Sequence, residues 1–296
     1  GNEAITSCPA EVRTVMSHAD SPHRTSQPIA PVETAQDPRA GVPGATAPRD
    51  PRRLESLDAL RGMIMVFMLS AGFGFPEVAK GFPESRFWQS LRYHCSHVPW
   101  AGGGAWDMIQ PAFIFMVGVA LPFSLARRAA AGEARRTQLR HAMRRSAVLI
   151  GLGLVLSHAP SFALTNVLAQ IGLGYMAAVV LVGRGARVQL TVAAAIIIVY
   201  WLAFAAYPVS DASTLGIKLA PRESFPGFFA HWNNHTNLAA AFDRWFLNLF
   251  PRDAPHVFNP SGTQTLNFVP SLATMIFGVV AGEVLRSARP PPARAD

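Results

Sequence analysis

The stretch "MIQPAFIFMVGVALPFSLARR", residues 108–128, decides the fold class. Its apolar part covers residues 108–126, close to the roughly 20 residues that a helix needs to cross about 30 Å of hydrocarbon. Arg127 and Arg128 follow directly, and basic residues at the end of an apolar run are typical of a cytoplasmic boundary. The whole chain agrees, because 50% of its residues are hydrophobic and only 15% are charged. Soluble enzymes of this length are rarely so apolar.

Similar apolar runs recur along the chain. We expect six spans, at residues 57–75, 108–126, 142–158, 163–182, 188–207 and 266–286. The third is the weakest, because Arg144 and Arg145 intrude at its start and His158 closes it. The sequence therefore predicts an all-α fold, a polytopic bundle of transmembrane helices within residues 53–286.

The basic residues predict the orientation of these spans. They gather before the first span, in the second and fourth connections and after the last span: Arg49, Arg52, Arg53, Arg127, Arg128, Arg135, Arg136, Arg140, Arg144, Arg145, Arg184, Arg187, Arg286, Arg289 and Arg294. In the connection 76–107 three bases face three acids, and in 208–265 four face four. The positive-inside rule then predicts that both termini are cytoplasmic.

The net charge of +8 follows this membrane pattern, and the basic residues lack the aromatic interleaving of a nucleic-acid groove. We therefore expect a lipid bilayer and no nucleic acid as partner. The 24 arginines against two lysines suggest a GC-rich bacterial genome, which predicts a bacterial inner-membrane location. A homodimer is compatible with the sequence.

The segments outside the spans have their own predicted roles. Residues 1–52 are rich in Pro, Ala, Ser and Thr and predict a disordered cytoplasmic tail, and residues 287–296 form a second cytoplasmic tail. The outer connection 208–265 contains "NLAAAFDRWFLNLF", residues 237–250. Its apolar residues recur at helical spacing after a possible cap at Thr236 or Asn237. We expect an interfacial helix there.

The connection before the second span concentrates reactive side chains in "YHCSHVPWAGGGAWD", residues 93–107. A histidine oriented by a carboxylate suits general-base work or acyl transfer, and Asp107 lies on the same side of the membrane as His97. The glycines from Gly102 to Gly104 allow a ligand to approach the backbone closely. His94, Cys95, His97 and Asp107 make a weak zinc pattern, so we expect no metal.

Other polar residues fall inside or beside the predicted spans, where they are costly and therefore informative. Asp58 and Arg61 share one helix face and can pair with each other. Asn166 and Gln170, four residues apart, also share a face and must find partners in the bundle.

Four stretches carry a resemblance to a known family: "RLESLDALRGMIMVFML" (53–69), "HVPWAGGGAWDMIQPAFIFMVGVALPFSLARR" (97–128), "NVLAQIGLGY" (166–175) and "FNPSGTQTLNFVPSLATMIFGVVAGEVL" (258–285). In this order they resemble the motifs of the heparan-alpha-glucosaminide N-acetyltransferase family. The combination of SLDxLRG with H-x-x-W-x-G and a following aspartate is its most specific part.

The resemblance implies a membrane acetyltransferase that carries acetyl groups from cytosolic acetyl-CoA, its co-substrate, to the amine of a glucosamine-type sugar on the outer side. The family's proposed catalytic histidine corresponds to His97, and the neighbouring motif residues imply that Trp100, Gly102, His94 and Asn259 contact substrate. Asp107 would orient the imidazole. Asn166 or Gln170 would hydrogen-bond the thioester oxygen. The histidine would act as nucleophile or as base.

The chain also departs from the family. The usual Asp-Pro-Glu-Gly is Asn259-Pro260-Ser261-Gly262 here, without either acid. Members typically have ten or more spans, against the six expected in this chain, so a whole enzyme and a part of a larger bundle both stay open. Two alternatives therefore remain open: a non-catalytic transporter or sugar-binding membrane component, and an O-acyltransferase acting on an envelope polysaccharide.

Overall fold

The computed structural model describes residues 55–157 and 163–287, which form helices joined by turns and loops, without a strand in these two ranges. The predicted tail 1–52, residues 288–296 of the second predicted tail and His158 lie outside the described residues. The α-helices are α1 (Glu55–Leu69), α2 (Phe75–Val78), α3 (Arg86–His94), α4 (Ile109–Ala130), α5 (Arg135–Leu156), α6 (Val167–Leu181), α7 (Ala186–Ala206), α8 (Leu238–Leu247) and α9 (Phe268–Ser287). Short 3-10 helices are η1 (Ala71–Gly74), η2 (Ala79–Gly81), η3 (Trp106–Met108), η4 (Ala212–Leu215), η5 (Gly227–Trp232) and η6 (Thr265–Asn267).

Within the described ranges, three helices are long and apolar enough to cross a membrane. They are Trp106–Ala130, Ala186–Ala206 and Thr265–Ser287, which correspond to the second, fifth and sixth predicted spans. The expected all-α fold is confirmed for the described ranges, and these three helices have the length and apolar composition that a membrane span requires. Because lipid offers no hydrogen-bond partners, a helix that satisfies its own backbone is the element expected in these segments.

The remaining predicted spans differ from the helices at their ends. α1 ends at Leu69, before the expected residue 75, and the 3-10 helix η1 follows it. Phe73 and Gly74 in η1 have left-handed φ angles, through which a right-handed α-helix does not continue. α6 begins at Val167 because the Asn166 side chain caps it, accepting a hydrogen bond of 2.9 Å from Ala169 N. α5 begins at Arg135, earlier than expected, because arginine is a good helix former that an apolar pattern overlooks.

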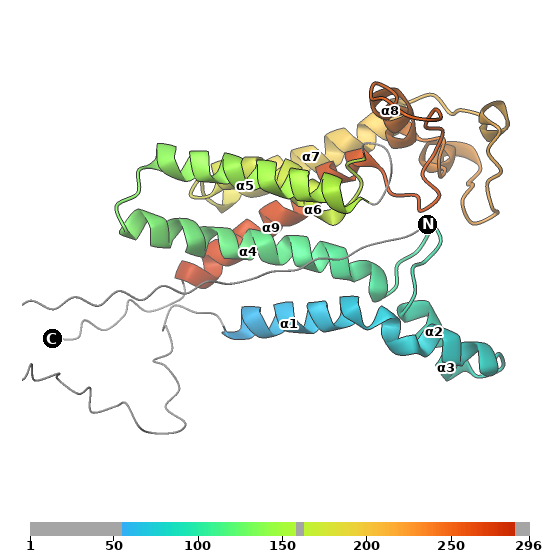
Figure 1. The fold of residues 1–296 in the computed structure, drawn as a ribbon, viewed down its shortest axis with the longest axis horizontal. Helices are drawn as coiled ribbons and strands as arrows, with labels where there is room; N and C mark the ends of the chain where they lie inside the picture. Colours follow the sequence, from blue (N-terminus) through green and yellow to red (C-terminus); the bar gives the residue numbers. More distant parts are fainter. Residues whose placement is uncertain (1–54, 158–162, 288–296) are drawn as a thin grey trace, which may run out of the picture. The chain divides into compact units, whose positions relative to one another are not determined.

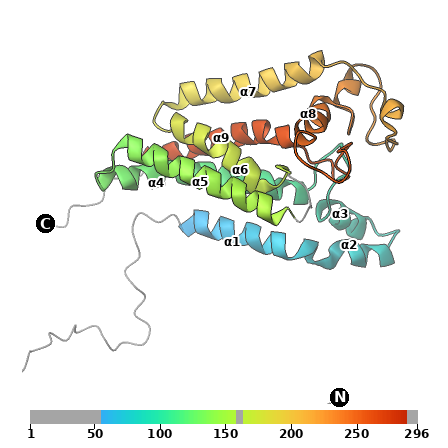
Figure 2. The ribbon, with the colours of Figure 1, turned by 45° about the horizontal axis from the view of Figure 1, so that its top comes forward.

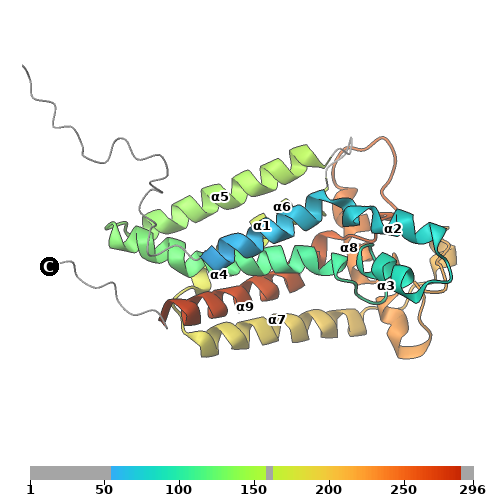
Figure 3. The ribbon, with the colours of Figure 1, turned by 90° about the horizontal axis from the view of Figure 1, so that it is seen from below.

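The long helices lie side by side and alternate in direction along the chain (Figures 1 and 3). α4 packs between α1 and α9, α9 also contacts α7 and α6, and α5 packs on α6. α7 and α1 therefore lie on opposite sides of the α4–α9 pair (Figure 2). We call the end where α4, α6 and α9 begin the histidine end and the end where they finish the arginine end.

Glycines bring the central helices unusually close. A Cβ atom added to Gly118 of α4 would lie 2.1 Å from Met275 O of α9, and one added to Gly278 would lie 2.1 Å from Phe115 O. Gly278 and Gly282 form a G-x-x-x-G pattern on α9, and small residues at this spacing allow membrane helices to pack backbone against backbone. The α4–α9 crossing is the core of the bundle, with Ile114, Met275 and Val279 buried beside it.

Polar contacts fix the two ends. At the arginine end the Glu283 carboxylate accepts hydrogen bonds from Gly183 N (2.7 Å) and Gln189 Nε2 (2.9 Å), which ties α9 to the turn between α6 and α7. At the histidine end the buried Gln170 Oε1 accepts from Gln110 Nε2 (2.9 Å) and Ser271 Oγ (3.0 Å). One side chain thereby joins the beginnings of α4, α6 and α9.

Candidate active site

A histidine and a carboxylate meet at the start of α4. His97 Nδ1 lies 2.8 Å from Asp107 Oδ1, although ten residues separate them. Because the carboxylate accepts, the imidazole donates its Nδ1 proton and keeps the lone pair on Nε2. The His97 side chain is 79% exposed and that of Asp107 is 27% exposed. Nε2 is thus open to solvent while the orienting carboxylate is partly enclosed.

The intervening loop positions the carboxylate. Asp107 Oδ2 accepts hydrogen bonds from Gly104 N (2.9 Å) and Val98 N (3.3 Å), so both oxygens of Asp107 are engaged. Gly104 passes so close to α3 that a Cβ atom there would lie 2.8 Å from Tyr93 O. The Trp106 ring meets the imidazole edge to face, with centroids 6.3 Å apart. The glycine run is therefore needed to fold the loop back onto its own aspartate.

Gly102 and Trp100 have structural contacts of their own. Gly102 adopts a φ of +122°, and a Cβ atom there would lie 2.9 Å from Val98 Cγ1. Trp100 Nε1 donates to Trp232 O over 2.8 Å, and its ring lies against Gly262. We call the loop 95–105, which carries His97 between α3 and η3, the histidine loop. Trp100 anchors this loop to the long segment between α7 and α9, a contact that the sequence did not indicate.

The other predicted contact residues are spread along the histidine end. His94 ends α3 with an exposed ring that meets Tyr93 edge to face. Asn166 donates to Gly153 O (2.7 Å) and Ser157 Oγ (2.8 Å) while it caps α6. Gln170 is 2% exposed and also donates to Thr165 O. Asn166 and Gln170 therefore have hydrogen-bond partners within the bundle, as expected. The Asn166 Nδ2 group makes two of these bonds as donor and the Gln170 Nε2 group makes one.

Asp58 and Arg61 lie far from this site along the bundle. Arg61 Nη1 contacts Asp58 Oδ1 at 3.3 Å across one turn of α1. Both side chains are about one-third exposed, so this pair contributes little to stability. We therefore interpret Asp58 and Arg61 as a local ion pair at the start of α1.

The sequence analysis expects Asn259 to contact substrate, whereas in the structure its side chain closes a turn. Its Nδ2 donates to Thr263 O and Thr263 Oγ1, and its Oδ1 accepts from Ser261 N and Ser261 Oγ. These bonds close the turn 259–263, in which Gly262 adopts a φ of +70°. The same turn touches Trp100 through Gly262 and also lines a cavity.

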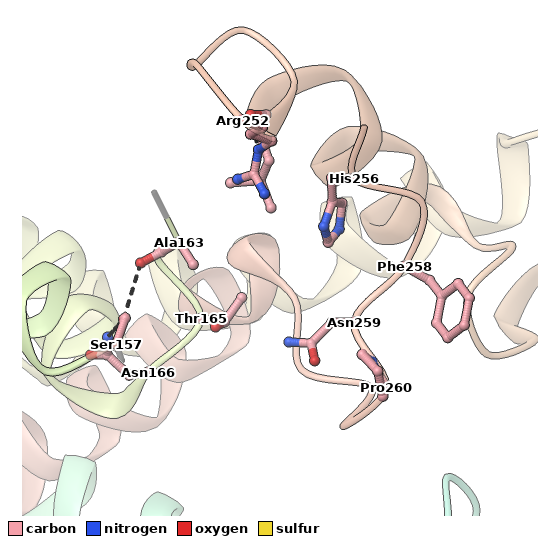
Figure 4. A pocket seen from close by; sticks show the side chains of 10 residues that line it. Ser157, Ala163, Thr165, Asn166, Arg252, His256, Phe258, Asn259 and Pro260 are labelled. Atoms are coloured by element: carbon pink, nitrogen blue, oxygen red, sulfur yellow. Dashed lines mark hydrogen bonds between the residues drawn. The ribbon is translucent and has the colours of Figure 1, made fainter. Parts of the chain in front are cut away.

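The cavity has a volume of about 360 Å³ and was not predicted from the sequence (Figure 4). Its described lining residues are Ser157, Ala163, Thr165, Asn166, Leu247, Arg252, His256, Phe258, Asn259 and Pro260. Burial lowers the pKa of His256, and the guanidinium groups of Arg252 and Arg244 lower it further. The residues that line the cavity follow no sequence motif in their spacing, so sequence analysis could not predict the cavity.

A polar cluster supports the long segment beside the cavity. Asn233, Asn234, His235, Thr236 and Asn237 are all buried. Asn237 caps α8 by accepting from Ala240 N (3.0 Å), and the buried Asp243 accepts from Thr265 N through both oxygens. α8 is thereby tied to the beginning of α9, while its Trp245 side is exposed.

No family model matches this chain, and no curated protein matches it.

Proposed function

We propose that the chain is a membrane-bound acetyltransferase that moves an acetyl group from cytosolic acetyl-CoA to the amine of a glucosamine-type sugar on the outer side. The observation that carries this proposal is the His97–Asp107 pair, with its 2.8 Å hydrogen bond and its exposed Nε2. A histidine held in one tautomer by a carboxylate is the arrangement that acyl-transfer sites use to activate a nucleophile.

In this proposal α1, α4, α5, α6, α7 and α9 are the six spans. The arginine end faces the bacterial cytoplasm together with both termini, as the positive-inside rule requires. α6 has 15 residues and so reaches only about 22 Å. The loops at its two ends complete the crossing, since non-helical backbone is tolerated where it is buried within protein.

Thiol labelling tests this topology. Cys95 lies on the outer side in the proposal, so a membrane-impermeant maleimide added to intact cells should label a Cys8→Ser chain. A matched variant that carries Cys8→Ser, Cys95→Ser and Ala131→Cys presents its thiol between α4 and α5 and should react only after the membrane is opened. Equal labelling of both thiols from outside would contradict the orientation.

The arginine end suits the anionic part of the donor. Arg127, Arg136, Arg140, Arg184 and Arg187 are exposed there, and clustered cations raise the local concentration of phosphate-bearing molecules. Arg127 lies 20 residues along the helix from Asp107, which corresponds to about 30 Å. A donor whose phosphates stay among these arginines must therefore extend along the bundle to present its thioester to His97.

The reaction itself needs one base and one orienting carboxylate. As the acceptor amine attacks the thioester carbonyl, an N–C bond forms and the C–S bond breaks. His97 Nε2 takes the amine proton and returns it to the departing thiolate. If Nε2 attacks first, the acetyl group rests on the imidazole before the amine takes it. Both routes need the same hydrogen bond from Nδ1 to Asp107.

Proteoliposomes can test transfer across the bilayer. Acetyl-CoA labelled in the acetyl group is added on the side of the arginine end, and free glucosamine is enclosed on the side of the histidine end. We expect labelled N-acetylglucosamine to form only when donor and acceptor are on opposite sides of the membrane. Glucosamine movement without acetyl-CoA, and no labelled product, would instead identify a transporter.

A further inference from the structure

The cavity of about 360 Å³ lies beside the segment that follows α8, and its volume is at the small end of the range for small-molecule sites. Arg252, His256 and Asn259 reach toward it from one side, whereas Thr165 and Asn166 face it from the other (Figure 4). A single sugar ring or a group of similar size is therefore the kind of ligand that it can enclose.

The described lining of the cavity includes one guanidinium group, that of Arg252. The Arg252 Nε group donates to Leu247 O over 2.7 Å, which anchors this side chain at the wall. Arg244 and Arg252 are both close enough to His256 to act on its imidazole. Among the described lining residues none carries a carboxylate. Asp243 is close enough to interact with the charge of Arg252, but both of its oxygens accept from Thr265 N, and the side chain of Asp253, which follows Arg252, is exposed. A concave surface lined in this way attracts an anion.

A guanidinium group is well suited to phosphate. It can form two parallel charge-assisted hydrogen bonds with phosphate oxygens. The hydroxyl group of Thr165 belongs to the opposite wall and is a further hydrogen-bond donor.

The cavity is connected to the histidine loop through one turn. Asn259 and Pro260 line the cavity, and Gly262 of the same turn packs against the Trp100 ring. Trp100 stands three residues after His97. One rigid turn, closed by the hydrogen bonds of Asn259, therefore separates the cavity from the loop that holds the dyad.

We infer that this cavity binds the phosphate group of the acceptor sugar, so that the acceptor is a phosphorylated amino sugar. That the ligand is an acceptor rests on the proposed acetyltransferase function, whereas the anion site itself rests on the cavity alone. Bound in this way, the sugar would contact the turn 259–262, with its amine on the side of the histidine loop.

Equilibrium binding to the full chain in a neutral detergent tests the inference without acetyl transfer. The probes are glucosamine and glucosamine 6-phosphate. We expect the phosphorylated sugar to bind at least about tenfold more tightly, the size of one charge-assisted contact. Arg252→Gln should remove this preference, and Arg252→Lys should keep part of it because it retains the charge without the planar fork. Arg222→Gln, an exposed arginine of the same segment, should bind as the wild type does.

A second measurement uses the wild type only, because Arg252 also contacts the backbone. Inorganic phosphate should compete with glucosamine 6-phosphate and leave glucosamine binding unchanged. Equal affinity for the two sugars, or an undiminished preference in a folded Arg252→Gln variant, would overturn the inference.

The two proposals fail in different ways. A phosphate preference without any acetyl transfer would leave the anion site standing and refute the acetyltransferase. Acetyl transfer to both sugars without a difference in affinity would do the opposite.

Discussion

Gly118 of α4 and Gly278 of α9 face each other where these two helices cross, and a Cβ atom added to either glycine would lie 2.1 Å from a backbone oxygen of the other helix. α4 begins beside Asp107 and α9 begins beside Thr265. The crossing therefore sets how the histidine loop and the segment that bears the cavity are held at one end.

Gly278→Ala should destabilise the chain by about 1–3 kcal/mol, the usual cost of overpacking. The added methyl would lie 2.1 Å from Phe115 O, and this clash outweighs the helix propensity of about 1 kcal/mol that alanine gains over glycine. Thermal unfolding in detergent measures the effect. Gly151→Ala is the matched control, because a Cβ atom there meets nothing within 4 Å, and it should be neutral or stabilising. Equal midpoints for the two variants would contradict the close crossing.

Gln170→Leu removes the acceptor for Gln110 and Ser271 and the donor to Thr165 O. Hydrogen bonds within membrane bundles average about 0.6 kcal/mol each, so the loss should be about 2 kcal/mol. Ser271→Ala removes one of these bonds and should cost about a third as much. If both variants unfolded at the same midpoint, Gln170 would not be the joint between α4, α6 and α9.

The stability of the long segment between α7 and α9 should fall as the pH is lowered from 7.5 to 5.5. The pKa of His256 in the folded chain lies below its ordinary 6.5, because burial and the charges of Arg252 and Arg244 disfavour the imidazolium. The unfolded chain then binds the proton first, and stability is lost as the pH falls from about 6.5 toward the lowered pKa. The slope is at most about 1.4 kcal/mol per pH unit for one group.

Replacing His256 by glutamine should flatten this pH dependence. A residual slope is expected from His235, whose pKa burial also lowers. Unfolding midpoints of both proteins across the pH range provide the comparison. An unchanged slope in the His256→Gln variant would mean that this imidazole does not titrate in that window.

Asp107→Asn should lower the rate of acetyl transfer by about 10²–10⁴-fold, the usual contribution of a general base, because the substitution removes the carboxylate that orients His97 for this role. An amide can place its N–H toward His97 Nδ1 and so favour the tautomer with its proton on Nε2. Glu77→Gln is the control, since this exposed carboxylate pairs with Lys80 and belongs to the same end of the bundle. Similar rates for both variants would remove Asp107 from the reaction.

The sequence predicted the apolar helices well, because hydrophobic length is a local property. Asn237 as a cap of α8 and the Asp58–Arg61 pair were also predictable, since they depend on residues within one turn. The early start of α5 was missed because its first residues are arginines rather than apolar residues. The G-x-x-x-G pattern of α9 was readable, but its partner on α4 was not.

In the candidate site, too, the local features were predicted from the sequence and the long-range contacts were not. His97 and Asp107 were predicted as a pair from their residue types, and the 2.8 Å contact between them depends on a glycine loop whose folding also involves Tyr93. Trp100 was predicted to contact substrate, yet its nitrogen binds Trp232 O, 132 residues away. The cavity combines residues from before α6 with residues after α8. Such long-range contacts leave no spacing pattern in the sequence.

The central claim is that His97 performs acyl transfer, and the most direct test is label transfer from acetyl-CoA to a glucosamine acceptor by the purified, reconstituted chain. We predict that His97→Ala abolishes transfer while His141→Ala, an exposed histidine of α5, retains it, with both variants unfolding at the wild-type midpoint. Transfer that persists in folded His97→Ala protein would remove this histidine from the chemistry, and a wild type that neither binds acetyl-CoA nor transfers label would contradict the account.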